Sequence, residues 1–350
     1  MNIKFLFTYF LGLLWNLNDK FTLAREWKTR IEKVDGSSNQ DYEIYSTWDE
    51  FKTAYNRSFS MGYRESRRQK AYEHNLAEIN KHNKAFEEGQ STFKMRTTSM
   101  CDLETQEYRG RYIKLEESPI DLTHGSDIVA SAYGTNDDLP LAVDWREEGF
   151  VTPPENQKSC GACYAFSIAA SVEGQVFARI NKIIKLSTQQ MVDCSVSHGN
   201  HGCSGGSLRN TLRYLEERGG LMREKDYPYV AAQNKCKFIE QLSIVNVTTW
   251  AILPPRQEEL LQLAVATIGP IPISINAAPR SFQLYSSGIY DDPECKSNAV
   301  NHAMLLIGYT PKYWIIKNWW GKNWGENGYM KIVRGKNMCG LANFPAYAVV

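Results

Sequence analysis

Cys163 stands where a polar loop becomes a helix, a position that can make a thiol reactive. The loop contains Gln157 and Gly161, and the segment from Ala165 to Ile180 that follows is rich in alanine and larger apolar residues. These larger residues recur four apart, which predicts a helix with one buried face formed by Ile168, Val172, Val176 and Ile180. The partial positive charge at a helix N-terminus lowers a thiol pKa and favours the nucleophilic thiolate. Cys163 is therefore a candidate nucleophile, and a half-cystine or an inert buried thiol remains the alternative.

The chain holds eight cysteines, at positions 101, 160, 163, 194, 203, 236, 295 and 339. The run Cys160-Gly161-Ala162-Cys163-Tyr164 resembles the active-site signature of the papain family of cysteine peptidases. From Trp48 to the C-terminus the chain resembles a cathepsin L-like proenzyme of that family. The resemblance implies three disulfides, although spacing alone does not fix their connectivity: Cys160–Cys203, Cys194–Cys236 and Cys295–Cys339. Cys163 would then be unpaired, as a nucleophile must be, and Cys101 would be the odd cysteine of the prosegment.

The resemblance also assigns catalytic roles far downstream of the cysteine. His302, 139 residues after Cys163, would take the thiol proton and later protonate the leaving amine. Asn318, sixteen residues further on, would orient the imidazole ring, and Trp320 with Trp324 would shield that hydrogen bond from water. Gln157 would stabilise the oxyanion of the tetrahedral intermediate. Taken alone, the histidine is equally well explained as a core residue and the glutamine as an ordinary loop residue.

Two positions depart from the family pattern near these residues. Lys158 stands where glycine is common, and Trp319 stands where the family has serine after the asparagine. These departures are the support for a competing hypothesis, in which the chain is a catalytically impaired homologue that acts as a binding or inhibitory protein.

Substrate contacts are also implied by the resemblance. Gly205 and Gly206 would let a substrate backbone approach closely because they lack a Cβ atom. Phe344 would close the main specificity pocket, which takes the side chain second before the scissile bond. Val or Leu should then be preferred over Phe there, and Arg should be poor, unless Pro345 turns the ring into the core. The other substrate-binding residues expected from the alignment are Leu208, Ser274, Val300, Asn301 and Trp320.

The fold expected is α+β, a papain-like two-domain fold preceded by a helical inhibitory prosegment. Residues 1–18 predict a signal peptide, residues 19–138 the prosegment with an exposed linker at 121–138, and residues 139–350 the mature peptidase. Residues 139–243 should be mainly helical and residues 244–350 mainly β. The helices expected are one carrying Trp48, Phe51, Tyr55 and Phe59, then 63–88, 165–180 with Cys163 at its first turn, 187–195 with Ser187 as N-cap, and 257–268. Thr98, Met100 and Asp102 stand at the positions of a prosegment strand motif, although two of them differ from the residues usual in the family. Further strands are expected at 244–247, 271–275, 303–307, 313–317 and 329–333.

Composition gives no reason to invoke nucleic acid, because the net charge is only +1. Protein and peptide substrates, the chain's own prosegment and cystatin-like inhibitors are the expected partners of a monomer that needs no cofactor. A signal segment and paired cysteines favour the secretory pathway, ending in the lysosome or outside the cell. Asn56 and Asn246 each begin a glycosylation sequon. The alternative of a zinc-binding secreted domain is carried by Cys194, His198, His201 and Cys203. No insertion resembling an exopeptidase's occluding loop lies between Cys163 and Cys203, which favours cleavage of internal bonds.

Overall fold

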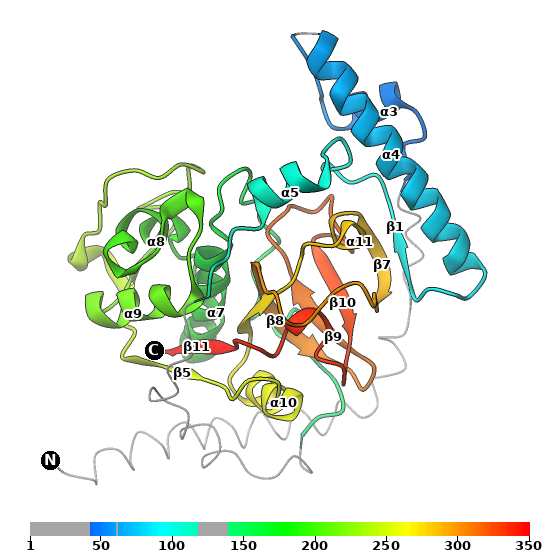
Figure 1. Cartoon of the computed structure of the whole chain (residues 1–350). Coiled ribbons are helices and arrows are strands. Elements are labelled where there is room, and N and C mark those ends of the chain that lie inside the picture. Colours follow the sequence, from blue (N-terminus) through cyan, green and yellow to red (C-terminus); the bar gives the residue numbers. More distant parts are fainter. Residues whose placement is uncertain (1–42, 61, 118–138) are drawn as a thin grey trace, which may run out of the picture.

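The computed structural model describes residues 43–60, 62–117 and 139–350, which form two lobes and an N-terminal helical arm (Figure 1). The predicted signal peptide and the predicted linker at 121–138 lie outside the described residues. In one lobe, α7 (Cys163–Ile180), α8 (Thr188–Cys194) and α9 (Leu208–Arg218) gather around a buried core. The other lobe is built on a twisted sheet with a separate core. We call these the helical lobe and the sheet lobe.

The sheet lobe is organised around β8 (His302–Tyr309), all eight residues of which are buried. β8 pairs antiparallel with β9 (Tyr313–Lys317), β6 (Ile271–Ile275) and β2 (Val143–Asp144). β10 (Tyr329–Val333) pairs antiparallel with β9 and parallel with β7 (Tyr285–Tyr290). The predicted bounds of β6, β9 and β10 are confirmed. The helix predicted at 257–268 is also present, as α10 (Glu258–Thr267). Short elements complete the fold: β3 (Leu221–Met222), β4 (Ser243–Val245) and α11 (Arg280–Gln283).

The helix α7 joins the two lobes. Ser167 Oγ donates to the Met304 carbonyl at 2.6 Å, and Ser171 Oγ donates to the Pro270 carbonyl at 2.8 Å, so helix and sheet are held in register. The predicted apolar face is buried as far as Val176, but Ile180 is 55% exposed because the helix outruns the core before ending at left-handed Asn181. Strand β5 (Thr249–Ile252) pairs antiparallel with the C-terminal strand β11 (Ala346–Val349), and both strands contribute residues to the helical-lobe core.

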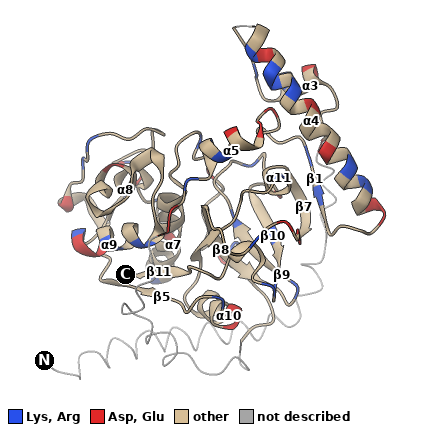
Figure 2. Cartoon of the chain, viewed as in Figure 1, with Lys and Arg blue, Asp and Glu red and all other residues tan. Residues whose placement is uncertain are grey.

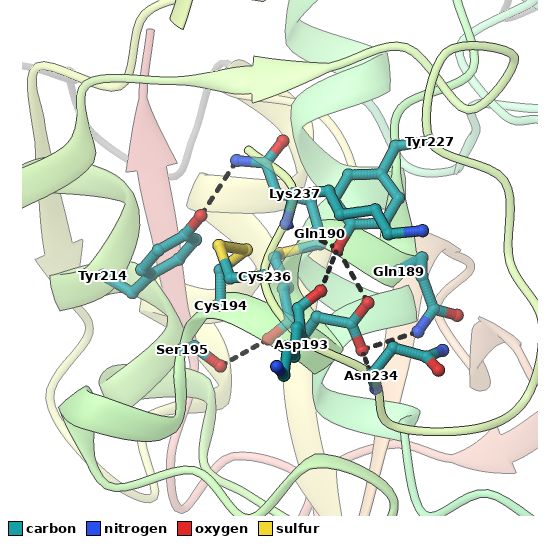
Figure 3. Close-up of a disulfide and its surroundings, with 12 residues drawn as sticks. Gln189, Gln190, Asp193, Cys194, Ser195, Tyr214, Tyr227, Asn234, Cys236 and Lys237 are labelled. Carbon is teal, nitrogen blue, oxygen red and sulfur yellow. Dashed lines mark hydrogen bonds between the residues drawn. A yellow bond between two sulfur atoms is a disulfide. The ribbon is translucent and has the colours of Figure 1, made fainter. Parts of the chain in front are cut away.

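Polar contacts hold both ends of α8. Ser187 caps this helix as predicted, since its side chain accepts from the Gln190 N–H. Around the disulfide between Cys194 and Cys236, the Asp193 carboxylate accepts a hydrogen bond from Tyr227 Oη at 2.7 Å (Figure 3). The disulfide and this buried carboxylate together tie the end of α8 to a segment that has no regular structure of its own.

The prosegment forms the helical arm. It contains α3 (Trp48–Ala54), which begins with a capping box, and α4 (Gly62–Glu87), along which cationic and anionic residues alternate (Figure 2). Trp48 and Phe51 stack at 5.6 Å between ring centroids and pack on α4. The predicted first helix is shorter than expected: Tyr55 is its C-cap, and Phe59 lies beyond it while still stacking on Trp48 at 5.8 Å.

After the arm, the prosegment docks on the sheet lobe and then crosses toward the helical lobe. Strand β1 (Phe93–Met95) adds to the edge of the sheet by pairing with β7, and α5 (Thr105–Tyr112) lies across the two lobes (Figure 1). Thr98, Met100 and Asp102 follow β1 in an irregular turn, so the predicted strand at this motif is wrong. The turn is held instead by side chains, because Asn75 Nδ2 donates to the Cys101 carbonyl at 2.8 Å. No helix in the described part of the chain combines the length and apolar character needed to cross a membrane.

Candidate active site

Cys163 is the first residue of α7 and is fully buried. Its sulfur is approached by backbone N–H groups of Ala303, Tyr164 and its own residue, which favour the thiolate, but burial outweighs them and raises the thiol pKa to about 12. Leu115 of the prosegment packs in the same apolar cluster. In the covered precursor, desolvation therefore dominates over the effect of the helix N-terminus.

His302 and Asn318 form a buried pair at the start of β8 and just after β9. His302 Nε2 lies 2.8 Å from Asn318 Oδ1, and the same oxygen accepts from the Trp319 N–H at 2.8 Å. Because a backbone donor identifies this atom as the amide oxygen, Nε2 must carry the imidazole proton. His302 Nδ1 is then a lone-pair nitrogen, and it has no hydrogen-bond partner among the described residues. The ring is thus held as a neutral base.

Burial lowers the pKa of His302 to about 4, while the hydrogen bond to Asn318 opposes this shift. A thiol with a raised pKa and an imidazole with a lowered pKa are both uncharged near neutral pH. The precursor therefore holds Cys163 and His302 as a neutral pair.

Aromatic side chains cover the His302–Asn318 bond. Trp320 stacks on the His302 ring with centroids 4.8 Å apart, and Trp324 meets Trp320 edge-on at 5.0 Å. Tyr108 of the prosegment adds an edge-to-face contact to Trp320 at 5.7 Å. Trp320 therefore lies against the histidine ring, and Trp324 lies against Trp320.

The two departures from the family pattern have local explanations. Lys158 has a φ of 55°, so this position is left-handed, where glycine is favoured and lysine is strained. Trp319 is fully buried: its Nε1 donates to the Ala303 carbonyl at 3.0 Å, and its ring stacks on Phe166 at 5.5 Å. Neither residue displaces His302 or Asn318.

Gln157 lies beside the cysteine loop and is fully buried. Its Nε2 donates to the Cys160 carbonyl at 3.0 Å and to the carbonyl of prosegment residue Tyr112 at 3.2 Å. The Gln157 side-chain amide thus donates a hydrogen bond to a peptide carbonyl of the prosegment. This is the kind of contact that an oxyanion donor makes.

The prosegment passes along the residues that were predicted to bind substrate backbone. The Glu116 N–H donates to the Gly206 carbonyl and the Leu115 N–H to the Asn301 carbonyl, each at 3.0 Å. A Cβ atom on Gly205 would lie 2.1 Å from the Lys114 carbonyl oxygen, so only glycine permits this approach. Asn301 contributes its backbone, since its side chain is turned toward residues 276–277.

The residues predicted for the specificity pocket come from both lobes. Leu208 and Ser274 are fully buried, while Val300 and Asn301 are half-buried. Phe344 is also half-buried and lies outside both hydrophobic cores, which argues against the alternative that Pro345 turns it inward. The Arg209 guanidinium carbon lies 5.0 Å from the centroid of its ring. The sequence analysis missed Arg209, Ser207 and Glu117. Ser207 and Arg209 could have been found because they flank Leu208, and Glu117 because it lies in the prosegment stretch after α5, residues 113–117, which we call the crossing segment.

All three predicted disulfides are present: Cys160–Cys203, Cys194–Cys236 and Cys295–Cys339. Two cysteines of the zinc hypothesis are consumed by these bonds, and His198 Nε2 bonds Glu217 at 2.7 Å, so that hypothesis loses its thiolate ligands. Cys101 and Cys163 are the free cysteines of the described chain, both buried, and burial raises the pKa of Cys101 as well. Asn56 and Asn246, which begin the sequons, are exposed.

This fold and site define a papain-type cysteine protease held in precursor form. Residues 139–349 match the papain family cysteine protease domain, and residues 48–108 match the cathepsin propeptide inhibitor domain. The chain belongs to the papain family and is a cysteine-type endopeptidase of the cathepsin L-like group with its own prosegment. The predicted family and the predicted α+β papain-like fold are confirmed.

The chain is similar to cathepsin L2 of Homo sapiens, with 37% identity over 326 residues that cover 88% of this chain and 93% of that protein. Digestive cysteine proteinase 3 of Homarus americanus is 38% identical over 311 residues, covering 87% of this chain and 94% of its own. Among solved structures, digestive procathepsin L 3 of the Tenebrio molitor larval midgut has a TM-score of 0.78 at 32% identity, covering 87% of this chain and 98% of that one.

Proposed function

We propose that Cys163, His302, Asn318 and Gln157 hydrolyse internal peptide bonds through an acyl-enzyme once the prosegment is removed. The observation that carries this proposal is the hydrogen bond from His302 Nε2–H to Asn318 Oδ1, at 2.8 Å. It leaves the basic Nδ1 without a partner in the described structure, in the residue next to the Ala303 N–H that faces the sulfur.

In the proposed reaction, His302 Nδ1 takes the thiol proton and the sulfur attacks the scissile carbonyl carbon. The carbonyl oxygen becomes an oxyanion, which accepts hydrogen bonds from Gln157 Nε2 and the Cys163 N–H. The C–N bond breaks as the imidazolium protonates the leaving amine, and a thioester remains. Water then attacks this thioester, gives its proton to His302, and releases the carboxylic acid with the free thiol. Asn318 keeps the ring in the required tautomer throughout.

The surroundings of this site follow from the same proposal. Gly205, Gly206, Asn301 and Trp320 hold substrate backbone, because the prosegment backbone already runs along the first three. The mature enzyme starts near Leu139 and acts as a monomer that cystatin-like proteins can block. The impaired-homologue alternative has lost its support, since Lys158 and Trp319 leave the paired side chains in place.

The secretory pathway, ending in the lysosome or outside the cell, is the proposed location. It is supported by three disulfides and by exposed sequon asparagines at 56 and 246.

The test uses the two free cysteines as a matched pair. The precursor is activated in acid and treated with an epoxide thiol inhibitor, and peptide hydrolysis and covalent labelling are measured. Cys163→Ala should lose both, whereas Cys101→Ala should keep both, because Cys101 lies buried in the prosegment. Hydrolysis that survives in Cys163→Ala, or a label that maps to another residue, would refute the nucleophile assignment.

A further inference from the structure

One prosegment side chain reaches a buried polar site between the lobes. Glu117 Oε2 accepts a hydrogen bond from Ser207 Oγ at 2.8 Å, and Glu117 Oε1 accepts one from Ser274 Oγ. Ser207 is the N-cap of α9 in the helical lobe, and Ser274 belongs to β6 in the sheet lobe. Both serines are fully buried. One carboxylate therefore bridges hydroxyl groups from the two sides of the predicted substrate cleft.

A buried cation lies beside the same carboxylate. Arg209 is 1% exposed, and its positive charge favours the ionised form of Glu117, just as the carboxylate favours the charged guanidinium. The guanidinium lies over the Phe344 ring, so a cation–π contact holds it in this position. Burial raises the pKa of Glu117, and the two hydroxyl groups and Arg209 oppose that shift. The Phe344 ring thus contacts the Arg209 guanidinium in addition to offering an apolar surface.

The Glu117 side chain reaches the residues expected to contact a substrate side chain, although the prosegment passes Gln157 earlier, at Tyr112, and therefore runs in the opposite chain direction from a substrate. The two residues before it, Leu115 and Glu116, hydrogen-bond through their N–H groups to the Asn301 and Gly206 carbonyls. An extended chain on this track places the Glu117 side chain among residues predicted for the main specificity pocket. Those residues include Ser274, Phe344 and the neighbour of Arg209, Leu208.

We propose that this pocket selects an acidic side chain, glutamate above all, at the substrate position second before the scissile bond. Glu117 occupies the pocket in the precursor in place of that substrate residue. When the prosegment leaves, Ser207, Ser274 and Arg209 lose this carboxylate, and a substrate side chain that enters the pocket takes its place. A substrate glutamate restores the contacts, whereas leucine offers no acceptor to the two serine hydroxyls and no negative charge to Arg209. This inference rests on the proposed function and replaces the apolar preference expected from Phe344 alone.

The first experiment measures kcat/KM of the activated enzyme on fluorogenic peptides that differ only at this position, with Glu, Leu, Val, Phe or Arg. At pH 6.5, about two units above the ordinary glutamate pKa, Glu should exceed Leu by about tenfold or more. Arg209→Met should abolish that ratio while Leu turnover persists. Arg213→Met is the control, because Arg213 is exposed one turn further along α9 and should leave the ratio unchanged.

The second experiment uses the intact precursor and does not depend on Arg209→Met folding. Glu117→Leu should increase the rate of epoxide labelling of Cys163 at neutral pH by about tenfold, because the prosegment leaves its track more often. Glu116→Leu makes the same change at an exposed neighbour and should label at the wild-type rate.

The inference is overturned if wild-type enzyme cleaves Leu peptides as well as Glu peptides, or if Glu117→Leu and Glu116→Leu label equally. Either result leaves hydrolysis and labelling of Cys163 intact. Failure of the proposed function would look different, with no peptide cleaved and no label on Cys163.

Discussion

Asn318 offers the sharpest test of how the site is held. Its Oδ1 accepts from His302 Nε2 and from the Trp319 N–H, both at 2.8 Å, and the residue is fully buried. Asn318→Ala removes the acceptor of two buried donors. Each such loss costs about 1–3 kcal/mol, so the free energy of unfolding should fall by about 2–6 kcal/mol. Losing the bond that fixes the histidine tautomer should lower kcat/KM by about 10- to 100-fold.

Asn318→Asp separates these effects, because a carboxylate still accepts from both donors. It also places a negative charge beside the imidazole, which should raise the His302 pKa and move the acid limb of kcat/KM to higher pH. Activity should lie between wild type and Asn318→Ala. The assay is kcat/KM against pH, with thermal unfolding of each variant as the control for folding. A folded Asn318→Ala within twofold of wild type, or an Asp variant less active than Ala, would refute the reasoning.

Three further predictions follow from single residues. Lys158→Gly should raise the free energy of unfolding by about 1 kcal/mol with unchanged kcat/KM, because glycine adopts the left-handed φ of 55° without strain; a lower thermal midpoint would contradict this. The buried Glu173 carboxylate accepts hydrogen bonds from Thr152 Oγ1 at 2.8 Å and from the Leu186 N–H at 2.9 Å, so Glu173→Ala should lower the free energy of unfolding by about 2–6 kcal/mol in denaturant unfolding; a loss below about 1 kcal/mol would contradict this. Glu104→Gln should raise the pH at which the precursor activates, whereas Glu87→Gln should not, and equal shifts would refute a role for the Glu104 ion pair.

The secondary-structure predictions that were confirmed rest on strong local sequence patterns. The apolar runs at 271–275, 313–317 and 329–333 are bounded by Gly, Pro and Asn turns, and they became β6, β9 and β10 without change. The capped start of α8 was equally explicit, since Ser187 is a strong N-cap residue. The family resemblance supplied the disulfide pairing that spacing could not.

The failures are non-local. α9 was missed because its buried Leu212 and Leu215 are diluted by polar residues such as Arg213 and Glu217. β7 was missed because Gly288, at a φ of 89°, interrupts its pattern, and its partners β1 and β10 are distant in sequence. The charge state of the site was also out of reach. It depends on burial under prosegment residues such as Leu115, which are distant in sequence from the cysteine, and no local pattern records this.

The ion pairs of the prosegment decide where acid can weaken it. Hydrogen bonds from Lys52 and Trp48 lower the pKa of Glu65, and those from Arg67 lower the pKa of Glu104. A carboxylate with a lowered pKa stabilises the folded arrangement above its unfolded pKa, and this stabilisation is lost as the pH falls through the lower folded value. Both pairs brace α4, one against α3 and the other against the start of α5 (Figure 2). Acid therefore loosens the helical arm.

The carboxyl groups nearer the enzyme behave in the opposite way. Burial raises the pKa of Asp102 and of Glu117, although Arg57 and Arg209 respectively oppose the shift. A group with a raised pKa binds its proton more tightly in the folded state, so acid strengthens its contribution as the pH falls through the folded value. Protonation of Asp102 and Glu117 thus does not weaken the contacts of the prosegment residues that lie against the enzyme. We therefore expect acid to act first on the ion pairs of α4, as Glu65 and Glu104 lose their charge, and the residues that cover Cys163 to leave afterwards.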